Sequence, residues 1–157
     1  MKKDKITIMF SRLFPTTHSR RGEPTRFIEQ VMLGDKIHTI RRQYDKWRVL
    51  ADKTHARRYD ISLCQWAATP RRSKHHQVGL LDGRIGVQRI QLLYFADTDN
   101  IIATVDGNID VAIETLAAND GLSVDDFKEW FFGKNRREHG NNEYNGCIIH
   151  FTDFRYS

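Results

Sequence analysis

Alternation of apolar and polar side chains marks the beginning of the chain as a strand. Ile6, Ile8 and Phe10 recur at every second position, which is the period of a strand with one buried face. The next segment, residues 11–26, is polar and contains two of the three prolines. It predicts a long loop between this strand and the first helix.

Apolar residues then recur at the spacing of three and four that is typical of helices. The first predicted helix covers residues 26–33, with Thr25 as its cap and Gly34 at its end. Its apolar stripe consists of Phe27, Ile28, Val31 and Met32. A second helix is predicted over residues 44–56. Its apolar face consists of Tyr44, Trp47, Leu50 and Ala51.

The middle of the chain favours strands. They are predicted at residues 36–41, 61–66, 77–81 and 85–95, the last range holding one or two strands. The dipeptide Asp82-Gly83 predicts a turn between them.

The last third favours helices. Asp110 is expected to cap a helix that continues to residue 117, and Ser123 to cap another that contains Phe127 and Trp130. A final strand is predicted over residues 147–151. Strands at both ends of the chain can pair only within a common sheet, so the pattern predicts a single α+β domain over residues 1–157.

Composition places the chain among globular proteins. It has 157 residues, the length of one ordinary domain, with 39% hydrophobic and 29% charged residues. No apolar run reaches the roughly 18 residues of a membrane span, so no membrane partner is expected. Cys64 and Cys147 lie far apart and indicate neither a disulfide framework nor a zinc site. We therefore expect a cytoplasmic protein with reduced thiols, no metal and no cofactor.

Positive charge is concentrated in the first half of the chain. The net charge is +5, but residues 1–76 hold 18 Lys and Arg against 7 Asp and Glu, whereas residues 77–157 hold 7 against 13. Arginine supplies 16 of the 25 cations, and its planar head suits phosphate and nucleobase contact. The asymmetry predicts a polyanionic partner, with a solvated basic face as the alternative interpretation.

The segment from Gly34 to Arg41 carries the densest set of chemically active side chains. Strand alternation places Lys36 and His38 on one face and Thr39 on the other. A bulge at the start of the strand would be needed to bring Lys36 and Thr39 together. On the pattern alone, an ordinary polar strand with a packed or hydrogen-bonded His38 is the alternative interpretation.

Three motifs, in this order, resemble the ASCH domain family, whose fold is similar to the PUA RNA-binding barrel. They are Gly34-x-Lys36-x-x-Thr39-x-Arg41, then Asn119-Asp120-Gly121-Leu122-Ser123-x-x-x-Phe127, and the closing strand Ile148-Ile149-His150-Phe151. The match covers about residues 27–154, with residues 11–26 as an added loop. The resemblance implies a partly open β-barrel with flanking helices and a basic cleft that holds RNA or a nucleotide.

The resemblance also implies a catalytic trio. The enzymatic members that the chain is similar to are bacterial amidohydrolases that remove the acetyl group from acetylcytidine nucleosides. Their functional Lys, Thr and Glu fall on Lys36, Thr39 and Asp120. Two positions depart from the family pattern, because Ile37 stands where many members carry a Thr and Asp120 is one carbon shorter than Glu.

Amide cleavage gives each member of the trio a role. Thr39 would be the nucleophile, and Lys36 would be its base if desolvation or nearby cations lower the lysine pKa. Asp120 would protonate the leaving cytosine nitrogen, and Arg41 or backbone N–H groups would stabilise the oxyanion.

The same residues also fit a binding role without catalysis. The side chains and backbone expected to contact RNA or substrate belong to Gly34, His38, Arg41, Arg42, Trp66, Arg71, Arg72 and Lys74. For Trp47 and Trp66, burial in the core is the alternative to base stacking. A third interpretation stays open, in which a non-catalytic protein-interaction module docks its basic half on an acidic protein.

Overall fold

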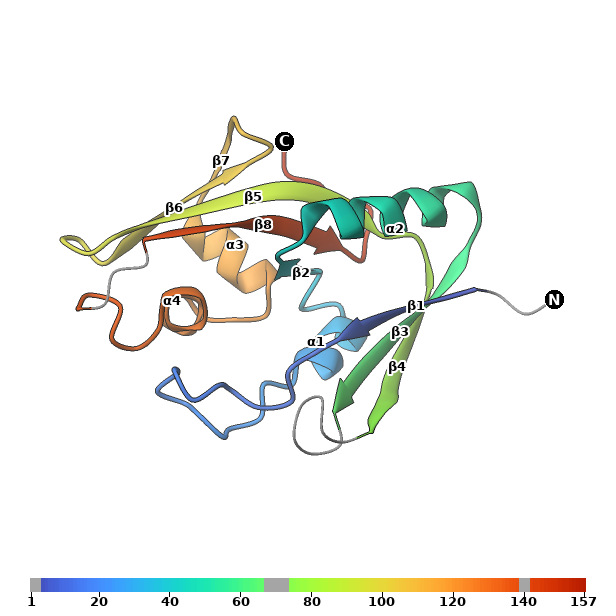
Figure 1. Ribbon diagram of the computed structural model, residues 1–157, viewed down its shortest axis with the longest axis horizontal. Coiled ribbons are helices and arrows are strands. Elements are labelled where there is room, and N and C mark those ends of the chain that lie inside the picture. Colours follow the sequence, from blue (N-terminus) through green and yellow to red (C-terminus); the bar gives the residue numbers. More distant parts are fainter. Residues whose placement is uncertain (1–3, 67–73, 139–141) are drawn as a thin grey trace.

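The computed structural model describes residues 4–66, 74–138 and 142–157 (Figure 1). These residues form four helices and eight strands. The helices are α1 (Phe27–Leu33), α2 (Tyr44–Ala56), α3 (Ile113–Asn119) and α4 (Val124–Phe132). The strands are β1 (Lys5–Met9), β2 (His38–Arg41), β3 (Tyr59–Trp66), β4 (His75–Gly83), β5 (Gly86–Phe95), β6 (Asn100–Val105), β7 (Ile109–Val111) and β8 (Glu143–His150).

The described strands divide into two sheets. A three-stranded sheet has the order β1-β3-β4, with β1 parallel to β3 and β4 antiparallel to it. A five-stranded antiparallel sheet has the order β2-β8-β5-β6-β7. The predicted α+β class is therefore confirmed, whereas the described strands do not close into a barrel.

Helices cover both faces of the five-stranded sheet (Figure 1). On one face the sheet packs on α4, where Tyr94 stacks on Phe132 with ring centroids 5.3 Å apart and Tyr144 meets Phe131 edge-on. On the other face α2 contacts β5 and β8. None of the described helices is long and apolar enough to cross a membrane.

Local capping signals place several elements correctly. The predicted range of α2 coincides with the helix in the structure. Gly34 ends α1 in the left-handed conformation, with φ of 86°, as expected of a glycine just past a helix. The Ser123 hydroxyl accepts the backbone N–H of Asp126 at 3.1 Å and so caps α4.

The predicted cap of α1 is wrong. Its N-cap is Arg26, which has a left-handed backbone and makes no side-chain cap bond. The Thr25 hydroxyl instead donates to the backbone carbonyl of Ser11 at 2.7 Å. A contact within the loop therefore prevails over the local capping preference.

Several strand boundaries also differ from the prediction. Asp110 lies within β7 and caps no helix, because the Asp106-Gly107 turn, with φ of 51° and 81°, reverses the chain into an additional antiparallel strand. No strand was predicted over Asn100–Val105, which forms β6 by antiparallel pairing with β5. Asp82-Gly83 ends β4 rather than forming a hairpin turn, and the strand predicted at residues 36–41 begins at His38.

The loop at residues 11–26 is anchored on the helices. Leu13 and Pro24 form an isolated bridge, and the Phe14 N–H donates to the Glu23 carbonyl at 2.9 Å. The Phe14 ring packs edge-on against Trp130 of α4 at 5.9 Å. The loop consequently forms one wall beside α1 and α4.

Candidate functional site

The end of α1 and the end of α3 bring Lys36 and Asp120 together. Gly34 turns the chain sharply after α1, and Asp120 is the C-terminal cap of α3. The Lys36 ammonium donates to the Asp120 backbone carbonyl at 2.5 Å and to its carboxylate Oδ1 at 3.2 Å. The same nitrogen lies 4.5 Å from the centre of the Phe27 ring. Lys36 is only 2% exposed and Asp120 only 4%, so the pair is buried.

His38 extends this pair into a buried hydrogen-bond chain. Its Nδ1 lies 3.2 Å from Asp120 Oδ1, and its Nε2 lies 2.8 Å from the Tyr156 hydroxyl. The Asn119 amide donates to that hydroxyl at 3.1 Å. The chain is satisfied if Tyr156 donates to Nε2 and Nδ1–H donates to Asp120. Burial raises the pKa of Tyr156 to about 12, which keeps its hydroxyl a donor.

Gln88 fixes the C-terminal segment against the sheet. Its amide nitrogen donates to Asp106 at 2.9 Å and to the Tyr156 carbonyl at 3.0 Å. Its oxygen accepts the Tyr156 N–H at 3.0 Å and faces His150 Nε2 at 2.9 Å. All four hydrogen-bonding positions of the amide are therefore used, and Tyr156 is held over His38.

Burial controls the charge of the two basic groups at this centre. The loss of hydration lowers the pKa of Lys36, helped by the nearby charge of Arg41 and opposed by Asp120. Burial also lowers the pKa of His150 to about 3, with smaller contributions from His38 and Arg155. His150 is fully buried, and its Nδ1 has no hydrogen-bond partner among the described residues. The ring is therefore neutral at physiological pH.

A cleft of about 670 Å³ lies beside the buried pair. It is walled by the loop at residues 11–26, by α1 and by the connection from α3 to α4. Gly121 and Gln30 line it, and a side-chain carbon added at Gly121 would lie 3.2 Å from the Lys36 side chain and 2.7 Å from the Gln30 amide oxygen. These two residues therefore separate the cleft from Lys36.

The charges around this cleft largely cancel. The Arg20 guanidinium contacts Asp126 at 2.6 Å and Glu23 at 3.4 Å. The remaining charged residues of the lining are Arg26 and Glu29, one of each sign. The positively charged wall implied by the family resemblance is therefore not found at this cleft.

The structure brings together only part of the predicted catalytic set. Lys36 and Asp120 are in contact, and His38 joins them. The Thr39 hydroxyl is buried and accepts from the Arg41 guanidinium at 2.9 Å, and no hydrogen bond among the described residues links it to Lys36 or Asp120. Arg41 also donates to the Met9 carbonyl at 2.6 Å, so it ties β2 to β1.

The remaining predicted binding side chains among the described residues lie away from the Lys36 centre. Arg42 is exposed, with its guanidinium 4.2 Å from the Tyr144 ring centre. Trp66 is half-buried at the end of β3 against His75, and Lys74 is exposed nearby, whereas Trp47 is buried in the core. Arg71 and Arg72 lie outside the described residues. No described contact links these residues to Lys36.

The two cysteines are buried, as their apolar surroundings predict. Burial raises the pKa of Cys147 to about 11. A buried thiol with a raised pKa is a poor nucleophile, so Cys147 is not assigned to the site.

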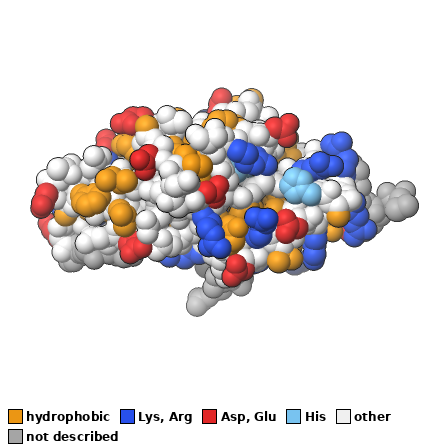
Figure 2. Space-filling model, turned by 90° about the horizontal axis from the view of Figure 1, so that it is seen from above, with side chains coloured by type: hydrophobic (Ala, Val, Ile, Leu, Met, Phe, Trp, Pro, Cys, Tyr) orange, Lys and Arg blue, Asp and Glu red, His pale blue; other side chains and the backbone are white. Residues whose placement is uncertain are grey.

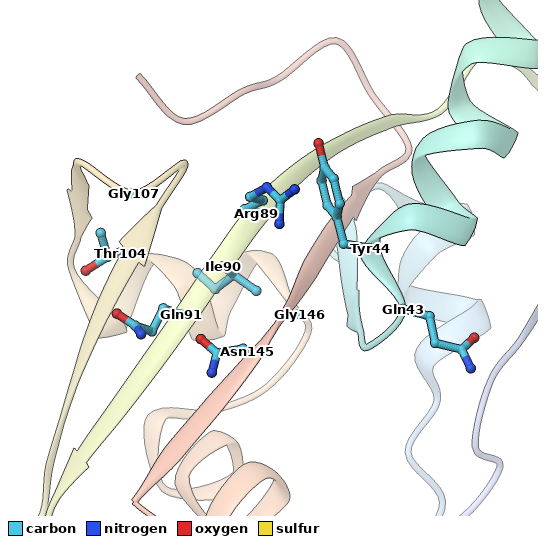
Figure 3. Close-up of a pocket in the computed structure, with 9 residues that line it drawn as sticks. All are labelled: Gln43, Tyr44, Arg89, Ile90, Gln91, Thr104, Gly107, Asn145 and Gly146. Atoms are coloured by element: carbon cyan, nitrogen blue, oxygen red, sulfur yellow. The ribbon is translucent and has the colours of Figure 1, made fainter.

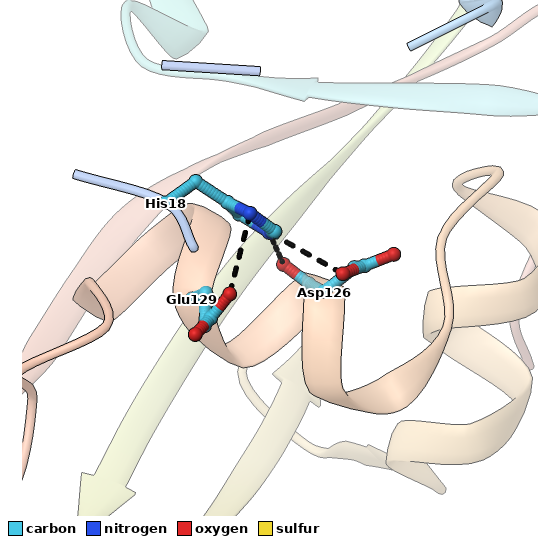
Figure 4. Close-up of side chains that lie close together, drawn as sticks. All are labelled: His18, Asp126 and Glu129. Carbon is cyan, nitrogen blue, oxygen red and sulfur yellow. Dashed lines mark hydrogen bonds and ion pairs between the residues drawn. The ribbon is translucent and has the colours of Figure 1, made fainter. Parts of the chain in front are cut away.

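The sequence analysis missed a second polar cluster, formed by His18, Asp126 and Glu129 (Figure 4). His18 is fully buried, with Nε2 3.2 Å from the Asp126 carbonyl and Nδ1 3.2 Å from the Glu129 carboxylate. One histidine and two carboxylates are a donor set that divalent metals accept. Both ring nitrogens are nevertheless engaged, since Nδ1 also faces the N–H of Arg20 at 3.0 Å. The cluster joins the loop at residues 11–26 to α4.

Gly121 offers a test of how tightly this centre is packed. It has φ of +81°, and so does Gly107, whose added side chain would meet nothing within 4 Å. Replacing either glycine by alanine incurs the same backbone strain, but only Gly121→Ala presses on Gln30 and Lys36. We expect Gly121→Ala to lower the free energy of unfolding by about 1–2 kcal/mol more than Gly107→Ala in urea titrations. Equal losses would show that the wall is loose.

Comparison of the chain with protein-family models, with curated proteins and with solved structures gives no match.

Proposed function

We propose that the protein recognises RNA or a nucleotide through an ASCH-like domain of the PUA-like fold, with Lys36, His38 and Asp120 as its binding centre. The observation that carries the proposal is the contact between Lys36 and Asp120, which lie 84 residues apart in the chain. A buried charged pair contributes little to stability, and polar groups with shifted pKa values beside a cleft favour a functional site.

The charge of the cleft favours the nucleoside part of the ligand over a run of phosphates. Arg20 is neutralised by Glu23 and Asp126, and the remaining lining is balanced. A nucleobase edge carries donors and acceptors side by side, and an amine next to a carboxylate complements such an edge. The base would reach Lys36 by displacing the Gln30 side chain, whose amide donates to the Thr25 carbonyl at 3.2 Å.

Calorimetric titration with cytidine and with cytidine monophosphate tests this proposal. We expect Lys36→Met and Asp120→Asn to weaken binding at least about tenfold, because each removes a polar contact in a water-poor site. Lys5→Met is the matched control, since Lys5 is exposed in β1 and its loss should change affinity less than about twofold. Cytidine binding should also vary little with salt, unlike a phosphate-driven interaction.

Two results would refute the proposed binding centre. One is the absence of nucleoside or nucleotide binding to the intact protein. The other is binding that Lys36→Met and Asp120→Asn, folded as judged by circular dichroism, leave unchanged.

Hydrolysis of an acylated cytidine is the second candidate, and the lowered pKa of Lys36 favours it. In this reaction the Thr39 oxygen attacks the acetyl carbonyl and its proton passes to Lys36. The bond from the carbonyl carbon to the cytosine nitrogen breaks, and Asp120, which takes the proton from Lys36, passes it to that nitrogen. Water then hydrolyses the acetyl ester of Thr39 to acetate. Thr39 must first leave its contact with Arg41.

Chromatographic detection of cytidine from acetylcytidine tests the reaction. We expect turnover by the intact protein and a loss of at least about a hundredfold in Lys36→Met and in Thr39→Val, because the first removes the base and the second the nucleophile. The absence of turnover, or unchanged turnover in either variant, would remove the catalytic role and leave recognition.

A further inference from the structure

A second groove lies across the five-stranded sheet from the Lys36 centre. Gln88 points to the His150 side of the sheet, so its neighbour Arg89 points to the opposite face, where α2 lies. The groove has a volume of about 330 Å³ (Figure 3). Its lining is Gln43, Tyr44, Arg89, Ile90, Gln91, Thr104, Gly107, Asn145 and Gly146, and it contains no acidic residue.

An arginine stacked on a tyrosine forms one end of this groove. The Arg89 guanidinium carbon lies 3.7 Å from the centre of the Tyr44 ring, and Figure 3 shows the two side chains facing each other. Arg48 contacts the Tyr44 hydroxyl at 3.3 Å and so steadies the ring. Arg89 is exposed, and its guanidinium makes no ion pair or hydrogen bond with another described residue. Its N–H edge and its second face are therefore available to a ligand.

Amide carbonyls extend along the floor of the groove. The amide nitrogens of Gln91 and Asn145 both donate to Glu143, at 3.0 Å and 2.8 Å. This contact orients the two amides and leaves their carbonyl oxygens without a hydrogen bond to any described residue. The groove thus combines a stacking cation with acceptors suited to the amino group of a nucleobase.

The surface around the groove carries a small excess of positive charge. Figure 2 shows Lys and Arg side chains gathered over the half of this face where α2 lies. The exposed cations of α2 are Lys46, Arg48 and Lys53, and the exposed carboxylates Asp45 and Asp52 lie on the same helix. Arg48 is paired with Asp52 at 3.3 Å, whereas the Lys46 ammonium lies 5.0 Å from the Trp47 ring centre and has no acidic partner among the described residues. With Arg89 and Glu143 included, four cations stand against three carboxylates here, whereas two cations stand against three carboxylates at the Lys36 cleft, so a polyanion is attracted to this face rather than to the cleft.

We propose that this outer groove binds an unpaired nucleotide of a single-stranded polynucleotide. The base stacks on the open face of the Arg89 guanidinium and directs its amino group to Gln91 and Asn145, and the adjacent phosphates follow the cations of α2. A groove of this size admits one base but no duplex. The site goes beyond the proposed function, because it lies on the opposite face of the sheet and uses none of Lys36, His38 and Asp120.

Fluorescence anisotropy with a labelled ten-nucleotide adenosine RNA tests the groove in the full chain. Arg89→Met should weaken binding about tenfold or more, since stacking contributes roughly 1–3 kcal/mol per base. Arg89→Lys keeps the charge but loses the planar stack, so we expect it to recover less than half of that loss on a logarithmic scale. Arg84→Met, which removes another exposed arginine that lies outside the groove, should weaken binding less than about threefold.

A DNA strand of the same sequence should show the same loss for Arg89→Met, because neither stacking nor phosphate contact involves the 2′-hydroxyl. Equal effects of Arg89→Met and Arg84→Met, or full rescue by Arg89→Lys, would overturn the proposal and leave only diffuse charge attraction. Cytidine binding at the Lys36 centre is measured separately with Lys36→Met. A negative result for RNA binding at the outer groove can therefore be distinguished from a negative result for nucleoside binding at the Lys36 centre.

Discussion

Asp120→Ala is expected to lower the free energy of unfolding by about 3–5 kcal/mol. The substitution leaves the Lys36 ammonium buried without its carboxylate, and an uncompensated buried charge is among the most destabilising changes in a protein. It also removes the partner of His38 Nδ1. Urea denaturation at pH 7 measures the loss.

Two further variants separate this effect from the general loss of an acidic residue. Asp125→Ala removes an exposed carboxylate from the first turn of α4 and should change stability little. Adding Lys36→Met to Asp120→Ala removes the stranded charge and should restore part of the loss. If Asp120→Ala and Asp125→Ala have equal effects, or the second substitution restores nothing, then Lys36 and Asp120 are not the coupled pair described above.

Acid is expected to destabilise the protein through His150 before the carboxylates are protonated. The pKa of His150 is about 3 in the folded state and about 6.5 when unfolded. Between these values the unfolded state binds a proton that the folded state does not, so stability is complete above pH 6.5 and falls as the pH is lowered. From pH 7.5 to 4.5 we expect a loss of about 2–3 kcal/mol from this residue, at 1.36 kcal/mol per pH unit.

Urea titrations of His150→Gln across the same pH range check the cause. The glutamine amide can still donate to Gln88, but it takes up no proton, so the loss between pH 7.5 and 4.5 should shrink by most of that amount. His55→Gln is the control, because His55 is exposed on α2 and its removal should preserve the loss. The carboxylate of Asp99, whose pKa is lowered by Arg136, adds to the loss of stability only below about pH 4. An unchanged loss in His150→Gln would show that His150 charges freely in the fold.

Local signals in the sequence were sufficient for elements whose ends depend on nearby residues. Gly34 and Ser123 act within one helical turn of themselves, and both end or begin a helix as predicted. The helix cap predicted at Asp110 was wrong because the hairpin at Gly107 adds β7 to the sheet, and β7 forms only by pairing with β6. The helix cap predicted at Thr25 was wrong because its hydroxyl donates to Ser11, which lies 14 residues away.

The candidate site shows the same division. Alternation correctly placed Lys36 and His38 on one side, and the family resemblance pointed to Asp120. Tyr156 and Gln88 complete the centre only through contacts that span 118 and 68 residues, and no short motif marks them. His18 likewise meets α4 across more than 100 residues. Such contacts follow from the order of strands in the sheets, which the period of the pattern does not determine.

We propose that a nucleoside occupies the cleft above Lys36 and Asp120. Amide chemical-shift mapping of the isotopically labelled protein during a cytidine titration tests it most directly. We predict saturable shifts at Gln30, Gly121 and Leu122, which line the cleft, with loss of those shifts in Lys36→Met. Saturable shifts confined to other surfaces, with these three amides unmoved, would show that the nucleoside binds elsewhere.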